Sequence, residues 1–191
     1  MDHAQSRHEA IEKAQAFLAQ KPVFLDTETT GTHNRAEIIE ICIVGSGGQV
    51  LVDSLVQPVN KIPKDATKIH GISNEMVKDA LTWTALWPEV EAALSSQHIG
   101  IYNADFDLRL IKQTHKKRKL EWEPIGAKGF CIMKLYAQFY GEWDETKGDF
   151  KWQSLTKAGD QCAINIPNSH RAKSDTLLAR AVLHHIANSS Q

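Results

Sequence analysis

A chain of 191 residues is long enough for one domain with a full core, and its hydrophobic content of 42% excludes a disordered protein. Lys and Arg number 22 against 23 for Asp and Glu, so the formal net charge is −1 and no overall basic field indicates a polyanionic partner. Any nucleic acid would have to be held by a local basic patch or by metal ions.

The cysteines and the N-terminal segment bear on the cellular compartment. Cys42, Cys131 and Cys162 are far apart and form no CxxC pair, so we expect neither a zinc site nor a disulfide scaffold. The N-terminus is polar, and no apolar run reaches the length of a membrane span. We therefore expect a cytoplasmic protein without membrane contact.

The first part of the chain predicts a helix and then three strands. Apolar residues at helical spacing predict a helix over 7–20, which Lys21-Pro22 ends. Three segments rich in strand formers follow, at 23–28, 37–45 and 50–58. The Gly/Ser run between the last two predicts a hairpin.

Helices dominate the rest of the chain. Ser73 can cap a helix that begins at Asn74, and another helix is predicted over 86–96 with Pro88 in its first turn. The remaining expectations are a buried strand at 98–103, helices at 107–119, 131–141, 151–162 and 174–187, and a polar surface loop at 141–149. Three early strands, then helices alternating with a further strand, predict an α/β fold with a mixed sheet covered by helices.

Two acids stand at the end of the first predicted strand. Asp26 and Glu28 point to the same face of this strand as Phe24. If the strand has simply ended, both carboxylates are solvated. One-sided acid pairs at strand ends are also how hard cations such as Mg²⁺ and Mn²⁺ are held. Both interpretations stay open at this point.

Two further acids stand at the start of a predicted helix. Asp105 occupies the position of an N-cap. Asp107 precedes Leu110 and Ile111 by three and four residues, so it shares the face that these side chains bury. Favourable charge near a helix N-terminus explains an acid in the first turn, but it explains an acid on the core face less well.

The last predicted helix repeats this pattern. Asp175 precedes Leu178 and Ala179 by three and four residues, so an acid again lies on an apolar stripe near a helix start. His170 is five residues upstream. A lone histidine is more often a surface or core residue than a catalyst, but local spacing ties this one to an acid.

Acids in three distant segments thus stand where the pattern favours apolar residues. If they converge, they repel one another strongly at low dielectric, and two divalent cations would cancel four negative charges. In two-metal sites the ions clamp both oxygens of an in-line phosphoryl displacement. We hypothesise that two divalent ions, Mg²⁺ or Mn²⁺, bind between Asp26, Glu28, Asp107 and Asp175.

Three motifs in order resemble the DEDDh 3′→5′ exonucleases, the DnaQ-like group within the RNase H-like fold. The motifs are FLDTETTG at 24–31, YNADFD at 102–107 and HRAKSD at 170–175. IHGIS at 69–73 is similar to the segment this family has between its first two motifs. The group includes the epsilon subunit of bacterial DNA polymerase III and exonuclease X-like enzymes, so the resemblance implies an RNase H-like mixed sheet of three antiparallel strands plus parallel strands.

The resemblance also implies roles for individual residues. The metal ligands and catalytic residues would be Asp26, Glu28, Asp107 and Asp175, with His170 as the general base, and the substrate contacts Thr27, Thr29, His70 and Asn103. Arg171 stands where a sister subfamily has Tyr, so the histidine subfamily is the better match. The second motif commonly begins with His-Asn, whereas this chain has Tyr102 there, at a position that is not a ligand.

The reaction implied by the family is hydrolysis of the terminal phosphodiester at DNA 3′ ends, which releases nucleoside 5′-monophosphates and serves proofreading or DNA repair. An RNA-trimming enzyme of the same group is one alternative. A catalytically silent nucleic-acid-binding domain is the other, and the presence of all five motif residues disfavours it.

Three further expectations concern organisation and partners. We expect an N-terminal helical extension over 1–21 and an exonuclease domain over 22–188. Little chain follows the last helix, so we expect a free-standing enzyme, with a polymerase partner left open and the oligomeric state not predicted. The basic run 115–119, preceded by Lys112, is either a solvated helix end or a grip on phosphates.

Overall fold

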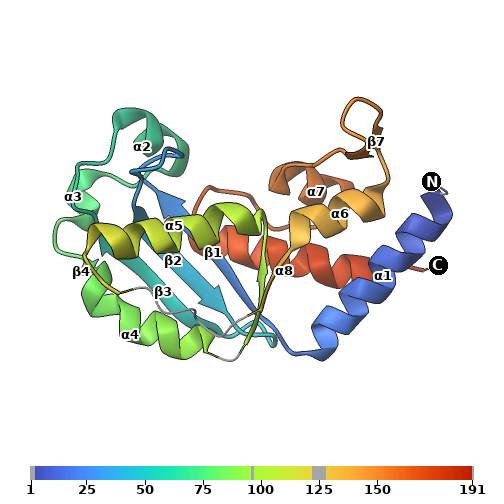
Figure 1. The fold of residues 1–191 in the computed structure, drawn as a ribbon, viewed down its shortest axis with the longest axis horizontal. Helices are drawn as coiled ribbons and strands as arrows, with labels where there is room; N and C mark the ends of the chain where they lie inside the picture. The colour runs from blue at the N-terminus through green and yellow to red at the C-terminus, as the bar shows by residue number, and fades with distance from the viewer. Residues whose placement is uncertain (1–2, 96, 122–127, 191) are drawn as a thin grey trace.

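A mixed sheet lies between two layers of helices in the computed structural model, which describes residues 3–95, 97–121 and 128–190 (Figure 1). The six strands have the order β4-β3-β2-β1-β5-β6. Their bounds are β1 Val23–Thr29, β2 Ile38–Val44, β3 Val50–Gln57, β4 Leu81–Thr82, β5 His98–Ile101 and β6 Lys128–Cys131. β1, β2 and β3 are antiparallel neighbours, and β5 and β6 run parallel to β1. The predicted α/β sheet is therefore confirmed.

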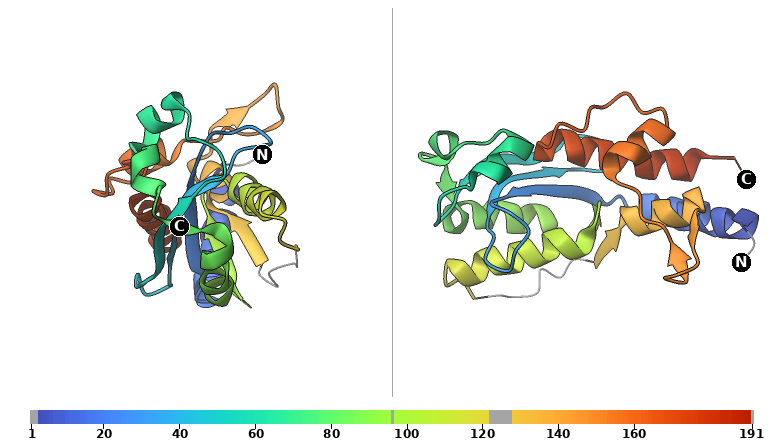
Figure 2. Two further views of the ribbon diagram at one scale, coloured as in Figure 1. Left: turned by 90° about the vertical axis from the view of Figure 1, so that its left-hand side faces the viewer. Right: turned by 90° about the horizontal axis from the view of Figure 1, so that it is seen from above.

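The helices cover both faces and one end of this sheet. Their bounds are α1 His3–Ala19, α2 Lys64–His70, α3 Asn74–Val77, α4 Trp83–Leu94, α5 Ala104–Lys117, α6 Ile132–Tyr140, α7 Leu155–Gln161 and α8 Ala172–Asn188. α8 packs on one face of the sheet, and α4 and α5 cover the opposite face (Figure 2). α1 contacts α6 and α8 at the end of the molecule where both termini lie.

Apolar alternation along β1 decides which way its acids point. Phe24 belongs to the core cluster formed with α1, α6, α7 and α8, whereas Leu25 belongs to the cluster formed with α4 and α5. Side chains alternate between the two faces of a strand, so Asp26 and Glu28 share the α8 face and Thr27 shares the α5 face. β2 is buried along its whole length and is rich in Ile and Val, as expected of a strand covered on both faces.

Three local expectations are corrected by the structure. The N-cap of α5 is Asn103 in the left-handed conformation, so the helix begins earlier than predicted and Asp105 lies inside its first turn. Thr82 caps α4, so the helix starts before 86 and Pro88 falls in its second turn. The segment predicted as a plain loop at 141–149 contains a small hairpin of β7 Trp143–Asp144 and β8 Asp149–Phe150.

Other elements agree with the expectations or add to them. Ser73 caps α3 by accepting a hydrogen bond from the Met76 N–H, as predicted. The short elements α2, β4 and β6 were not predicted. Residue 96, at the end of the predicted helix over 86–96, and residues 1–2 of the predicted extension lie outside the described residues. In the described ranges, every helix is too short or too polar to cross a bilayer.

Candidate active site

The acid pair at the end of β1 lies where the strand pairing shifts. Asp26 is opposite Cys42 and Glu28 is opposite Glu40, and the register slips between Glu28 and Thr29. Such irregularities re-aim side chains at the ends of strands. Both carboxylates are only partly buried and line a pocket of about 270 Å³ on the α8 side.

Asp107 reaches the same pocket from α5. Its side chain is 2% exposed, which confirms that this acid lies on the buried face of the helix. The Thr27 hydroxyl donates a hydrogen bond of 2.7 Å to Asp107 Oδ1. The bond links β1 to α5, so Thr27 fixes the rotamer of an acid in the pocket. The predicted contact of Thr27 with substrate stays a prediction.

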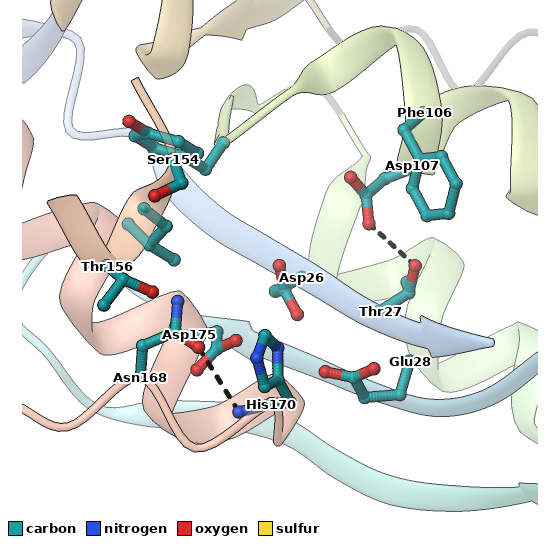
Figure 3. A pocket seen from close by; sticks show the side chains of 12 residues that line it. Asp26, Thr27, Glu28, Phe106, Asp107, Ser154, Thr156, Asn168, His170 and Asp175 are labelled. Atoms are coloured by element: carbon teal, nitrogen blue, oxygen red, sulfur yellow. Dashed lines mark hydrogen bonds between the residues drawn. The ribbon is translucent and has the colours of Figure 1, made fainter. Parts of the chain in front are cut away.

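Asp175 and His170 come from the start of α8. Asp175 is buried in the first turn, on the face that also buries Leu178, Ala179 and Val182. His170 is exposed just before the helix, with a positive φ of 50°, and its N–H donates to Asn168 Oδ1 at 3.4 Å. One ligand atom of each of Glu28, His170 and Asp175 lies within 4.8 Å of the others (Figure 3). The structure thus brings together all five residues of the three motifs.

Burial makes this cluster of negative charge costly. Desolvation, followed by repulsion from Asp107, raises the pKa of Asp26 well above its ordinary value. Burial also raises the pKa of Glu28 to about 8, of Asp107 to about 7 and of Asp175 to about 6. Four such carboxyl groups can all be ionised at neutral pH only if a positive charge compensates them.

The donor set fits divalent metal ions. Asp175 Oδ1 is buried without a hydrogen-bond partner among the described residues. Carboxylate oxygens are the ligands that Mg²⁺ and Mn²⁺ prefer, and a bound cation would both satisfy this oxygen and reverse the pKa shifts. The pocket therefore has the chemistry of a metal centre.

An ion pair next to the pocket involves a further acid, Glu40 of β2. Buried Glu40 accepts hydrogen bonds from Arg171 Nε at 3.0 and 3.1 Å and from the Ala172 N–H at 2.8 Å. Since Arg171 follows His170 and Ala172 begins α8, these bonds attach the segment that carries His170 to β2. The sequence could have pointed to a structural role for Glu40, because it is an acid inside an otherwise apolar strand.

A second pocket of about 460 Å³ adjoins the acids. It shares Thr27, Glu28 and Phe106 with the first pocket and extends along the chain after β1 to α2. Thr29 and His70, two predicted substrate contacts, both line it. Asn103, the remaining one, is absent from the described residues that line either pocket and occupies the N-cap position of α5 without a capping hydrogen bond from its side chain.

Several residues of the first pocket were not predicted from the sequence. They are Tyr102, Phe106, Ser154, Leu155, Thr156 and Asn168. The Tyr102 hydroxyl donates a hydrogen bond of 3.0 Å to the Gln153 carbonyl, so the residue that replaces the family's usual His ties β5 to the segment before α7. Single residues contributed by separate segments have no spacing signature that could reveal them.

Comparison with known proteins identifies the family of this chain. The sequence profile of the RNase_T exonuclease family matches residues 23–183. The chain is 37% identical over 181 residues to the uncharacterized exonuclease CP81 of Escherichia phage 186, covering 92% of this chain and 93% of that one. It is 32% identical over 97 residues to the DNA polymerase III subunit epsilon of Rickettsia felis, covering 48% of this chain and 42% of the subunit.

A solved structure agrees as well. Exonuclease X in complex with 5′ overhanging duplex DNA has a TM-score of 0.64 and 26% identity, with 88% of this chain and 92% of that one covered. The fold and site define a DnaQ-like nuclease with an RNase H-like sheet. The chain belongs to the RNase_T exonuclease family, whose members depend on divalent metal ions.

We predict that Glu40→Ala lowers the free energy of unfolding by about 1–3 kcal/mol, because the variant leaves the buried Ala172 N–H unpaired and Arg171 without its partner. Urea denaturation measures the change. Asp53→Ala is the matched control, since Asp53 pairs with Lys173 of the same helix at an exposed site and should cost less than about 1 kcal/mol. Equal losses in the two variants would contradict the role assigned to Glu40.

The raised pKa values predict how the metal-free protein responds to pH. Between the ordinary carboxyl pKa of about 4 and the raised values, the folded state binds more protons than the unfolded state, so stability falls as pH rises. From about pH 7 to about pH 8.5 the loss of stability should come mainly from Asp26, Glu28 and Asp107, because histidines contribute little above pH 7.

Thermal unfolding in EDTA across this pH range measures the effect, and Mg²⁺ should raise the melting temperature more at the upper end. In Glu28→Gln the slope should be smaller, since one titrating group with a raised pKa is gone. A melting temperature that stays constant or rises from pH 7 to pH 8.5 in EDTA would refute the prediction.

Proposed function

We propose that this protein is a 3′→5′ exonuclease that hydrolyses the terminal phosphodiester of DNA and releases nucleoside 5′-monophosphates. The observation that carries the proposal is the convergence of acids from β1, α5 and α8 on one pocket, with His170 beside Glu28 and Asp175. DNA is favoured because the relatives include a DNA polymerase III epsilon subunit and the similar solved structure holds duplex DNA. Proofreading, repair and a polymerase partner stay predictions.

The proposed metal ligands are Asp26, Glu28, Asp107 and Asp175. Two Mg²⁺ or Mn²⁺ ions, when bound, would neutralise these acids and stabilise negative charge on the phosphate under attack. Thr27 holds Asp107 in position through its hydroxyl, and the Glu40–Arg171 pair holds the start of α8. The protein thus keeps the ligands on three rigid elements.

His170 is the proposed general base. Its exposed ring stands next to Glu28 and Asp175, where it can take a proton from the attacking water. The water oxygen bonds to phosphorus, the bond from phosphorus to the 3′-oxygen breaks, and that oxygen leaves as the new strand end and takes up a proton. The product carries the phosphate on its 5′-oxygen.

The second pocket is the proposed site of the terminal nucleoside. Ile69 and Phe106 give it apolar walls on which a base can stack, and it begins at Glu28 and Thr29, where the 3′-hydroxyl would be met. A pocket that accepts one nucleoside at the strand end explains cleavage from the end rather than within the strand.

Digestion of a 5′-labelled oligonucleotide with and without Mg²⁺ tests the proposal, with the products identified by mass. We expect stepwise shortening from the 3′ end and nucleoside 5′-monophosphates, only when metal is present. Matched DNA and RNA oligonucleotides decide between the DNA and the RNA-trimming alternatives. A protein inert towards both under Mg²⁺ and Mn²⁺ would instead be the silent binding domain.

We predict that Asp107→Asn abolishes nuclease activity while leaving the fold intact. The amide keeps the shape of the side chain but removes a metal ligand and a buried charge, so the melting temperature in EDTA should not fall. Asp105→Asn is the matched control, because Asp105 is exposed on the same helix and pairs with Lys134. Wild-type turnover in Asp107→Asn would rule out its role.

We predict that His170→Ala lowers kcat on the order of 10²–10⁴-fold, a usual contribution of a general base. Single-turnover rates measure the effect, and the melting temperature should change little because the side chain is exposed. His170 has a positive φ of 50°, so His170→Asn is the second variant, since Asn tolerates this conformation better than Ala. An unchanged rate in both variants would exclude His170 as the base.

A further inference from the structure

The outer ridge of α5 carries positive charge that the proposed reaction does not use. Arg109, Lys112 and Lys116 follow one another at spacings of three and four residues, on the side opposite the buried face of the helix. All three are exposed. Exposed Arg35, from the chain between β1 and β2, lines a pocket of about 450 Å³ with Lys116. We call Arg35, Arg109, Lys112 and Lys116 the α5 patch.

The residues of the basic run 115–119 do not all face the solvent, and the exposed charge of α5 lies on this ridge instead. His115 is buried against Trp83 and Trp87. Lys117 pairs with Glu37 at 3.1 Å, and Arg118 donates to the Gln57 carbonyl. The run is therefore not one continuous surface, and three of its five residues make contacts that hold α5 in place.

The cations of the α5 patch lack acidic partners within the described ranges. By contrast, Lys134, Lys151 and Lys173 each lie within 2.9 Å of a carboxylate oxygen. An exposed cation without an ion pair gives up no carboxylate when it binds a phosphate, whereas a paired one must first release its own. The absence of competing acids makes this ridge suited to a polyanion.

The patch is continuous with the proposed nucleoside pocket. That pocket extends to Thr32 and His33, in the segment after β1. Arg109 donates to the Thr32 carbonyl at 3.4 Å, and Lys117 donates to the Arg35 carbonyl at 3.0 Å, so the segment lies along α5. A polynucleotide at the acids can therefore reach the α5 patch over the protein surface.

The order of the proposed sites along β1 indicates which DNA strand would reach the α5 patch. With the scissile phosphate at Asp26 and Glu28 and the 3′-hydroxyl at Thr29, the segment after β1 lies beyond the end of the strand being cut. α7, which contributes Ser154 at its cap and Thr156 to the acid pocket, lies on the opposite side of the site from the C-terminal end of α5 (Figure 1). In a duplex with a recessed 3′ end, only the unpaired 5′ overhang of the other strand continues past that end.

We propose that the α5 patch binds the backbone of this 5′ overhang, so that recessed 3′ ends of duplex DNA are preferred substrates. The proposal rests on the proposed function and adds a substrate class to it. Phosphates of the overhang bind Lys112 and Lys116, with Arg35 and Arg109 beside them.

The test measures affinity for three DNA molecules in Ca²⁺ instead of Mg²⁺: a duplex with a 5′ overhang, a blunt duplex and a single strand. The wild-type protein should bind the overhang duplex more tightly than the blunt one. In the double variant Lys112→Gln, Lys116→Gln this preference should disappear, and the salt slope for the overhang duplex should shrink by about 1.4, which is about 0.7 for each lost phosphate contact. Affinity for the other two should not change.

The matched control is the double variant Lys13→Gln, Lys128→Gln, which removes equal charge from exposed sites on α1 and β6. It should keep the preference for the overhang. Equal losses on all three DNA molecules, no change on any, or no preference in the wild-type protein would each overturn the proposal. Failure of the proposed function is measured separately, as digestion of single-stranded DNA with Mg²⁺. If the protein is an exonuclease, the wild-type protein and both double variants should digest the single strand at the same rate.

Discussion

Mutual repulsion among four carboxylates is the constraint on which the site depends. Asp26, Glu28, Asp107 and Asp175 lie on three elements, and the burial of neighbouring apolar residues fixes where each backbone runs. The hydrophobic core therefore holds the acids at positions where burial, and for Asp26 and Glu28 also the charge of the other acids, opposes ionisation, and the raised pKa values express this conflict. A divalent cation would remove the conflict, so the arrangement that is costly without metal is suited to bind one.

The protein resolves a neighbouring conflict with its own cation. Glu40 stands opposite Glu28 in the β1–β2 pairing, and two acids at facing positions destabilise a sheet. Arg171 neutralises the buried Glu40, whereas Glu28 remains beside His170 and Asp175. One acid of the pair thus stabilises the fold and the other stays available for a ligand. A single arginine separates the two roles, and it also anchors the loop that carries the proposed base.

The sequence predicted which acids lie together better than it predicted the details of the elements around them. Periodicity placed Asp107 and Asp175 on buried faces because flanking apolar residues define a helix face whatever the exact start of the helix. It misplaced the cap of α5, because the left-handed turn at Asn103 depends on how β5 meets the helix. It missed the β7–β8 hairpin, since a strand of two residues has no measurable alternation. The pairing of Glu40 with Arg171 joins residues 131 positions apart, which local patterns cannot reveal.

Sheet topology explains why the chemistry gathers at one edge. β1 lies between antiparallel β2 and parallel β5, so the C-terminal ends of β1 and β5 meet the beginning of β2 at the same edge. The connections that leave this edge carry the chain after β1 and the start of α5, and α8 reaches it across the opposite face. Ligands bind in α/β sheets where connections diverge in this way, because the diverging chains leave a crevice. Here the acids of β1, α5 and α8 line the crevice, α2 and α5 add apolar walls, and the outer side of α5 adds exposed cations. The proposed metal site, nucleoside pocket and phosphate-binding surface therefore all depend on the point where β1 lies between an antiparallel and a parallel neighbour.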